Sequence, residues 1–333
     1  MDPAAPKLED VHAAAARIAP HAVRTPVLRS AALDAEVGAQ LHFKCENLQR
    51  GGAFKFRGAC NAVMSLDAAT AARGVVTQSS GNHGTAIAIA ARVRGIAAHV
   101  VVPRNAPAIK LAQIREQGAR VILCEPTLAA RDAACAAVQA ETGAELVHPY
   151  DDVRVIAGQA TAAYELVEQV GALDAVIAPV SGGGLLSGTA IAAHGLDAAL
   201  RVFGGEPAQA ADAHESLRRG ILVTGMTPDT IADGLRAQLS ARTFGILRAH
   251  AVEVLLASED EIVYAMRLIW DRLKLVVEPS GAVALAALIA GHERVAGLRI
   301  GVILSGGNVD LDRLPWQEPR FRRALPPTAG GIA

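Results

Sequence analysis

Short apolar runs alternate with longer alanine-rich segments along most of the chain. Runs such as GVVTQ at 74–78, AAHVVVP at 97–103 and ARVILCE at 119–125 are rich in valine or isoleucine, and each precedes a stretch of helical length. The runs DAVIAPV at 174–180, RVFGGEP at 201–207, AVEVLLA at 251–257 and IGVILS at 300–305 repeat this texture. Such alternation is typical of βαβ units around parallel sheets. The pattern therefore predicts an α/β protein.

Composition narrows the class of protein without identifying it. The 333 residues are 51% hydrophobic, with a mean hydropathy of +0.28, which is enough to bury a large core. The formal net charge is −1, and no long run of one sign is present, so neither nucleic acid nor a membrane surface is an expected partner. Small-molecule chemistry is the better expectation.

The start of the chain and its cysteines point to a cytoplasmic protein. The first ten residues, MDPAAPKLED, lack a basic segment followed by an apolar one, and no later segment reads as a membrane span. The four cysteines, Cys45, Cys60, Cys124 and Cys135, form no C-x-x-C pair, so we expect reduced, mostly buried thiols.

Three glycine-rich loops follow apolar runs and predict a single binding cleft. They are SSGNHG at 79–84, SGGG at 181–184 and SGGN at 305–308. Open α/β sheets bind their ligands beyond the carboxyl ends of their strands, where these loops are expected. No linker or fixed-period repeat separates modules, so any domain division should follow the sheets.

The SGGG loop is a candidate phosphate site. Consecutive amides without Cβ atoms, at the start of a helix, can bind a phosphate, although a glycine turn can also serve packing alone. A dinucleotide site is the rival reading, with Glu206 as the ribose-binding acid. That pattern requires Gly or Ala where Ser187 stands. It also leaves Lys55 unexplained.

Lys55 lies between Phe54 and Phe56 in a chain whose aromatic content is 3%. A lysine among apolar groups has a lowered pKa and becomes a nucleophilic amine, whereas a surface lysine does not.

The other two glycine-rich loops offer polar groups to a ligand. In the SSGNHG loop, the helix start, the hydroxyls and the amide suit an amino-acid carboxylate, although Ser and Asn also serve as ordinary caps. Ser305 offers a neutral hydroxyl to a ring nitrogen, although a plain strand-end turn explains it equally well.

Together these motifs resemble the fold-type II pyridoxal phosphate enzymes, in particular the serine racemase and serine/threonine dehydratase group. The resemblance runs from RTPVLRS through KCENLQRGGAFKFRGA, SSGNHG, HPYDDVRVIAGQAT, PVSGGGLLSG, IADGLR and EPSGAVALAAL to LSGGNVDL. It implies two open twisted-sheet domains like those of the tryptophan synthase β-subunit, with the cofactor in the cleft between them. The large cofactor-binding domain would comprise residues 1–73 and 152–333, and a small mobile domain residues 74–151. A homodimer or homotetramer is expected.

The resemblance also implies roles for individual residues. Lys55 would form the Schiff base with the cofactor and carry a proton, and Ser80 could exchange a proton on the opposite face of Cα. The residues implied to contact the cofactor are Phe54, Lys55, Asn82 at the ring hydroxyl, Gly182, Gly183, Gly184 and Leu185 at the phosphate, and Ser305 at the pyridine nitrogen. The residues implied to bind substrate are Ser79, Ser80, Asn82, His83 and Arg131. The residues implied to hold Mg²⁺ or Ca²⁺ are Glu206, Asp212 and the carbonyl of Ala210.

Three positions depart from the animal racemases of this group. Ala237 replaces a serine near the substrate and Tyr150 an asparagine near the cofactor, which leaves room for a larger β-substituent such as an aryl group. Thr85 replaces a nucleotide-binding glutamine, so activation by ATP is not expected. The sequence also ends shortly after LSGGNVDL, so we expect no isoleucine-responsive regulatory domain.

The expected function is dehydration and deamination of a β-hydroxy-α-amino acid to a 2-oxo acid and ammonia. L-Threonine, L-serine and a β-aryl analogue such as phenylserine are the candidate substrates. An amino-acid racemase with dehydratase side activity is the nearest alternative. A nicotinamide oxidoreductase and a catalytically idle amino-acid-binding protein are alternatives of other classes.

Overall fold

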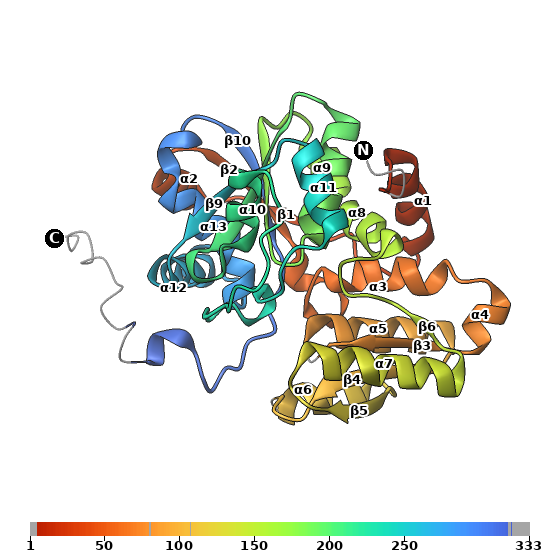
Figure 1. The fold of residues 1–333 in the computed structure, drawn as a ribbon. Helices are drawn as coiled ribbons and strands as arrows, with labels where there is room; N and C mark the ends of the chain where they lie inside the picture. The colour runs from red at the N-terminus through yellow and green to blue at the C-terminus, as the bar shows by residue number, and fades with distance from the viewer. Residues whose placement is uncertain (1–4, 80, 107, 319–320, 322–333) are drawn as a thin grey trace.

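The computed structural model describes residues 5–79, 81–106, 108–318 and 321, and contains two sheets (Figure 1). The six-stranded sheet has the order β1 (Val27–Leu28), β2 (Gln40–Cys45), β10 (Arg299–Leu304), β7 (Ala175–Pro179), β8 (Arg201–Pro207) and β9 (Glu253–Ala257). The four-stranded sheet has the order β5 (Arg120–Cys124), β4 (Ala98–Pro103), β3 (Val75–Gln78) and β6 (Glu145–Leu146). All neighbouring strands are parallel except β1 and β2. The predicted α/β fold with two open sheets is therefore confirmed.

Helices fill the connections between strands. They are α1 (Leu8–Ile18), α2 (Ala31–Val37), α3 (Lys55–Met64), α4 (Ala68–Ala72), α5 (Asn82–Arg94), α6 (Ala108–Glu116), α7 (Leu128–Thr142), α8 (Val153–Val170), α9 (Gly184–Leu196), α10 (Asp212–Arg219), α11 (Ala241–Ala249), α12 (Glu259–Leu268) and α13 (Pro279–Ala290). Within the described ranges, no helix combines the length and the apolar character needed to cross a membrane.

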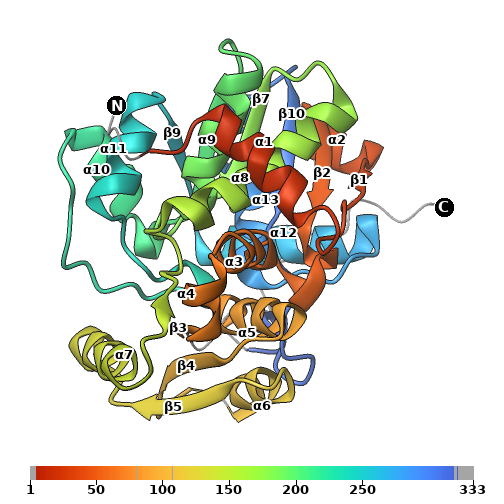
Figure 2. The same ribbon diagram turned by 90° about the vertical axis from the view of Figure 1, so that its right-hand side faces the viewer.

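Both sheets are covered on two faces, as continuous apolar strands require. In the large sheet, Ile177 and Phe203 pack in the core with α13, whereas Val176 and Val202 point to the opposite face and pack with α8 and α9. Figure 2 shows α8 and α9 on the face away from α13. In the small sheet, Val100 faces α5. Successive strand residues face opposite sides of a sheet, so each strand contributes to two cores.

Helix α3 connects the two sheets. It packs against α5, which covers the small sheet, and against α8, which covers the large one. Gly58 and Gly158 permit the contact with α8, because a Cβ on Gly158 would lie 2.6 Å from the Gly58 Cα atom. The first residue of α3 is Lys55. The predicted reactive amine therefore begins the helix that joins the two halves.

Candidate active site

The start of α3 is fixed against the end of β10. The Phe54 amide donates to the Ser305 carbonyl at 3.0 Å, and Ala53 forms an isolated β-bridge with Gly306. The amine of Lys55 donates to the carbonyl of Pro149 at 2.9 Å. The structure thus brings Phe54, Lys55 and Ser305 together from distant parts of the sequence.

The amine of Lys55 lies 5.1 Å from the centroid of the Phe54 ring. Although the residue as a whole is only partly buried, burial of its amine lowers its pKa to about 8. No carboxylate pairs with it among the described residues. An ammonium that loses water and gains no counter-charge is easier to deprotonate. The surroundings of Lys55 therefore make its amine easier to deprotonate than that of a surface lysine.

A buried ion network anchors α3 two residues further on. The fully buried Arg57 donates to Glu46 at 2.7 and 2.9 Å and to Glu165 on α8 at 2.8 Å through two nitrogens. The fully buried Lys44 donates to Glu165 at 2.6 Å and to the Thr25 carbonyl at 2.9 Å. These two cations and two anions balance in charge and link α3 to β2 and α8.

The glycine loop ends at the first turn of α9. Gly183 is the N-cap with φ of +87°, a conformation that favours glycine, and no side chain caps the helix. The amides of Gly184, Leu185 and Leu186 donate no hydrogen bond to any residue that the structure describes. Free amides at a helix N-terminus form an anion site, so this turn fits the phosphate of pyridoxal phosphate.

Packing against Tyr150 is a second reason for glycine at positions 182 and 184. A Cβ on Gly182 would lie 2.4 Å from the Tyr150 ring, and one on Gly184 would lie 3.0 Å from the Tyr150 Cα atom. The ring also makes an edge-on contact with His148, at 4.6 Å between centroids. Glycine at these positions is therefore required by protein packing as well as by any ligand.

Asn82 begins α5 and lies at the opposite side of the site. Its side-chain amide donates to Glu278 at 2.7 Å and accepts from Asn308 at 2.9 Å. Burial, with the charge of Asp233, raises the pKa of Glu278 to about 8, so this carboxyl is largely protonated at neutral pH. The Ser305 hydroxyl is buried and donates to the Ser280 carbonyl at 3.4 Å.

The rest of the SSGNHG loop offers further polar groups. The Ser79 hydroxyl accepts from the Gly81 amide at 3.2 Å, and Nε2 of His83 lies 3.4 Å from the Val147 carbonyl. Nδ1 of His83 is buried without a partner in the described part of the chain. Burial, followed by the charge of Lys55, holds the pKa of His83 well below its usual range, so the imidazole is neutral. Ser80 lies outside the described residues.

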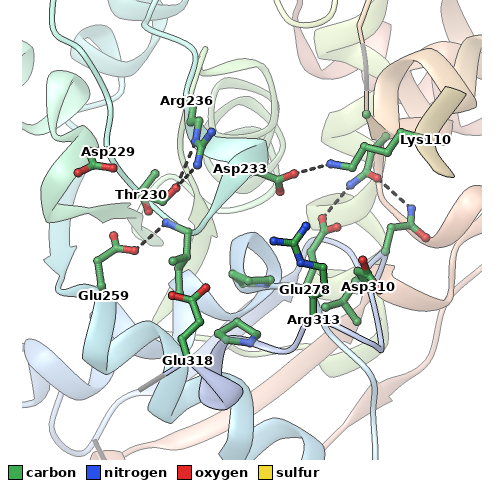
Figure 3. Close-up of a pocket in the computed structure, with 18 of the residues that line it drawn as sticks. Lys110, Asp229, Thr230, Asp233, Arg236, Glu259, Glu278, Asp310, Arg313 and Glu318 are labelled. Atoms are coloured by element: carbon green, nitrogen blue, oxygen red, sulfur yellow. Dashed lines mark hydrogen bonds and ion pairs between the residues drawn. The ribbon is translucent and has the colours of Figure 1, made fainter. Parts of the chain in front are cut away.

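A cavity of about 560 Å³ opens beside Asn82 and lies between elements of both sheets (Figure 3). Lys110, at the small-sheet side, pairs with Asp233 at the large-sheet side across it. Its lining also includes Gly81, Asn82, Glu278, Arg236, Asn308 and Arg313. Lys55, Tyr150 and the SGGG loop are not part of this lining, so the cavity does not enclose the amine.

The remaining predicted residues lie apart from this group. Arg131 is in α7 and is partly buried, and its Nε has no partner in the described structure. Glu206 accepts from the amides of Ala213 and His214 at 2.9 and 2.8 Å and so caps α10. Asp212 accepts from the Leu239 amide at 3.0 Å.

The acidic pair is compatible with a cation but does not establish one. Burial raises the pKa of Glu206 to about 8 and that of Asp212 to about 6, so a bound cation would relieve the cost of ionising them. Nowhere in the described ranges do three or more His, Cys, Asp or Glu side chains gather as metal ligands. A site here would need carbonyls, such as that of Ala210, and water. The divalent-cation site stays a prediction.

Sequence reasoning missed Glu278 and Asn308, although both belong to motifs that carry the resemblance, EPSGA and SGGN. Glu278 and Asn308 contact Asn82 although they lie 196 and 226 residues away in the sequence, and no local pattern predicts such contacts.

Ala237 is one of the positions that depart from the animal racemases. Its amide donates to the Ser181 hydroxyl and its carbonyl accepts from that hydroxyl, each at 3.0 Å. The predicted free thiols are confirmed, because all four cysteines are free and buried.

Comparison with known proteins agrees with this geometry. The sequence matches the family described as pyridoxal-phosphate dependent enzyme over residues 18–306. It is 51% identical to a beta-hydroxyaspartate dehydratase of Paracoccus denitrificans over 93% of this chain and 99% of that protein, and 48% identical to a serine racemase of Arabidopsis thaliana over 90% and 92%. The crystal structure of serine racemase from Dictyostelium discoideum is 46% identical, with a TM-score of 0.88 over 92% of this chain and 99% of that one. The chain therefore belongs to the family of pyridoxal-phosphate dependent enzymes.

Proposed function

We propose that the protein eliminates water from a β-hydroxy-α-amino acid and releases a 2-oxo acid and ammonia. The observation that carries the proposal is the amine of Lys55, which has no carboxylate partner among the described residues and has a pKa of about 8. The relative named for β-hydroxyaspartate dehydration, 51% identical, supports the same reaction class. L-Serine, L-threonine, phenylserine and 3-hydroxyaspartate are the candidate substrates.

Bound pyridoxal phosphate supplies an electron-withdrawing ring that makes the α-proton of an attached amino acid labile. The neutral Lys55 amine can accept that proton, because an amine with a pKa of about 8 is a suitable general base near neutral pH. The Pro149 carbonyl, 2.9 Å away, orients the amine. We assign to Lys55 both the attachment of the cofactor and the transfer of the proton.

Two neutral groups favour elimination over transamination. Ser305, the residue that we propose for the ring nitrogen, carries a hydroxyl, and the nearby Glu278 has a pKa of about 8. Neither places a full negative charge there at neutral pH, so that nitrogen is not held protonated by a carboxylate. The β-hydroxyl can then leave before a proton returns to the substrate.

The N-terminus of α5 is our proposed receptor for the substrate's α-carboxylate. Gly81 is its N-cap without a side-chain cap, and Ser79, Asn82 and His83 surround it. The helix dipole and free amides attract an anion. The neutral imidazole of His83 adds a polar group without adding a charge.

Amino-acid racemisation is the second candidate function. Two of the similar proteins are named serine racemases, and Ser80 is our proposed proton donor on the second face of Cα. Measuring 2-oxo acid release and the enantiomers of recovered amino acid in the same reaction separates the two activities. Keto acid formed faster than the D-enantiomer supports the dehydratase, and the reverse order contradicts it. Ser80→Ala is the control, because it should abolish racemisation first.

We also propose that residues 74–151 move as a unit against residues 1–73 and 152–333 when substrate binds. The pair of Lys110 and Asp233 lies across the cavity between these parts. Closure would bring Arg131 nearer the substrate. Hydrogen exchange of the holoenzyme with and without serine tests this, because closure should slow exchange around both residues of the pair. A homodimer or homotetramer remains our expectation for the assembly.

A further inference from the structure

The backbone from Gly234 to Ala237 runs between the two ends of the proposed cofactor site. The Gly234 amide donates to the Ser280 hydroxyl at 3.0 Å, and the Ser280 carbonyl accepts from Ser305. At its other end, Ala237 is held by Ser181, directly before the glycine loop. This short stretch is therefore held beside both ends of the proposed cofactor site.

Arg236 belongs to that stretch and lines the cavity. Its Nε and Nη2 donate to the Thr230 carbonyl at 3.1 and 2.5 Å, which fixes the guanidinium (Figure 3). No carboxylate lies within ion-pair distance of it in the described part of the chain, whereas Lys110 in the same cavity pairs with Asp233. The side chain is exposed, and its Nη1 donates no hydrogen bond within the described part of the chain. Arg236 is thus an oriented cation without a counter-ion.

The opposite wall of the cavity already suits one carboxylate. Gly81 and Asn82, at the N-terminus of α5, line the cavity together with Arg236. A substrate with a single carboxylate would bind only to the N-terminus of α5 and would leave Arg236 without a partner. One with a second carboxylate on Cβ could meet a cation on the other wall, and the small side chain of Ala237 leaves room beside it.

Six carboxyl groups line the cavity with Arg236, those of Asp229, Asp233, Glu259, Glu278, Asp310 and Glu318. Three of them are bound elsewhere or largely neutral. Asp233 is held by Lys110, and Glu259 accepts from the Ile231 amide at 2.7 Å. Glu278, with a pKa of about 8, is largely neutral at pH 7. A planar guanidinium with fixed donors matches a carboxylate better than an ammonium does.

We propose that Arg236 binds a β-carboxylate of the substrate and that the preferred substrate is a dicarboxylic β-hydroxy-α-amino acid of the 3-hydroxyaspartate type. The inference rests on the proposed β-elimination and names the substrate class of the same site. Arg236 is then a specificity-determining residue, and serine and threonine are poorer substrates because they leave its charge unpaired.

The test compares substrates and variants of the holoenzyme. Ammonia release is measured for the threo and erythro forms of 3-hydroxyaspartate, for serine and for threonine. Arg236→Gln should lower kcat/KM for 3-hydroxyaspartate roughly 10- to 100-fold, mostly through KM, as expected for a lost charged hydrogen bond. Its effect on serine should stay below about threefold. Arg272→Gln is the matched control, since Arg272 is an exposed arginine outside this cavity and its loss should change neither substrate.

A binding measurement supplies a readout besides activity. Succinate, which cannot react, should bind the wild-type protein in calorimetry and bind Arg236→Gln at least about tenfold more weakly. Arg236→Lys keeps the charge and should recover part of the loss. Equal losses for serine and 3-hydroxyaspartate in both variants would overturn the inference, because they would mean that Arg236 only supports the Thr230 loop.

The outcomes also separate this inference from the proposed function. If wild-type enzyme releases ammonia from serine or threonine at least as efficiently as from 3-hydroxyaspartate, the inference fails and the β-elimination stands. If no β-hydroxy amino acid yields ammonia, the proposed function fails. Succinate affinity that depends on Arg236 then still supports the carboxylate site, and affinity that does not depend on it rejects the site.

Discussion

Lys44 and Lys55 are both withdrawn from water, yet their surroundings give them opposite properties. Lys44 is fully buried and has three acceptors: Glu165, Gln169 and the Thr25 carbonyl. Burial lowers its pKa, but Glu165 partly offsets this. Lys55 has one neutral acceptor, and its pKa falls to about 8. The comparison shows that burial alone does not decide how reactive a lysine is, because a carboxylate partner favours the charged ammonium.

The two lysines are also mechanically linked. Glu165 binds both Lys44 and Arg57, and Arg57 lies two residues after Lys55 in α3. This network, whose two cations and two anions balance, therefore holds the helix that begins at Lys55, and no carboxylate of the described residues pairs with Lys55. Arg57, which anchors the helix, and Lys55, the proposed reactive residue, are therefore only two residues apart in the sequence.

The largest expected effect comes from removing the reactive amine. Lys55→Ala should lower ammonia release by about 1000-fold or more, because attachment of the cofactor and proton transfer both depend on that amine. The measurement is the coupled assay of 2-oxo acid with the holoenzyme. Lys44→Met is the comparison, and its effect on the remaining folded protein should be far smaller. Equal losses for the two would remove the distinction between them.

Breaking the network should affect stability instead. Arg57→Met leaves Glu46 and Glu165 without their main cation and should lower the free energy of unfolding by about 3–5 kcal/mol. Denaturant unfolding of the apoprotein measures this. Lys55→Met removes an uncompensated buried amine and should cost little or raise stability. A larger loss in Lys55→Met than in Arg57→Met would show that the structural and reactive roles are reversed.

Glu278 extends the comparison of the two lysines to a buried carboxyl group, whose pKa burial also shifts. Its pKa is about 8 in the folded protein against an ordinary value of 4.5, so the unfolded chain releases this proton first and stability falls as pH rises between those values. Glu278→Gln removes that dependence. The variant should gain about 1–3 kcal/mol relative to wild type between pH 5 and 8. Parallel stability curves for the two proteins would mean that Glu278 ionises normally.

The smallest expected effect is on the rate of cofactor attachment. At pH 7 about a tenth of the Lys55 amine is neutral, and at pH 9 about nine tenths, if its pKa is about 8. The rate at which apoprotein gains visible absorbance with pyridoxal phosphate should therefore rise about tenfold over this range. An amine with an ordinary lysine pKa would instead keep gaining reactivity well above pH 9.

Local patterns were sufficient to predict seven of the ten strands in the described structure, together with the glycine loops and Lys55. The apolar runs matched β3, β4, β5, β7, β8, β9 and β10, whereas β1, β2 and β6 were not predicted. The two phenylalanines beside Lys55 indicated its chemistry. The sequence could not show that Pro149 would accept from that amine, or that Tyr150 would pack on Gly182. These contacts depend on where the connection between β6 and α8 passes in the folded chain. They are properties of the assembled fold.

The same limit applies to charge. A buried pair such as Arg57 and Glu165 lies 108 residues apart, and neither residue stands out from ordinary helix-surface charges in the sequence. The glycine loop shows the converse. Its pattern indicated a phosphate site, which stays a prediction. The structure shows that the Tyr150 ring packs where a Cβ on Gly182 would lie, which the sequence did not indicate.

Peptide mapping after borohydride reduction tests the central claim most directly. The holoenzyme is treated with borohydride, digested and analysed by mass spectrometry for the lysine that carries the reduced cofactor. Our account predicts one labelled site, Lys55, with Lys44 unlabelled. Label on another lysine, or none despite stoichiometric bound pyridoxal phosphate, would contradict it.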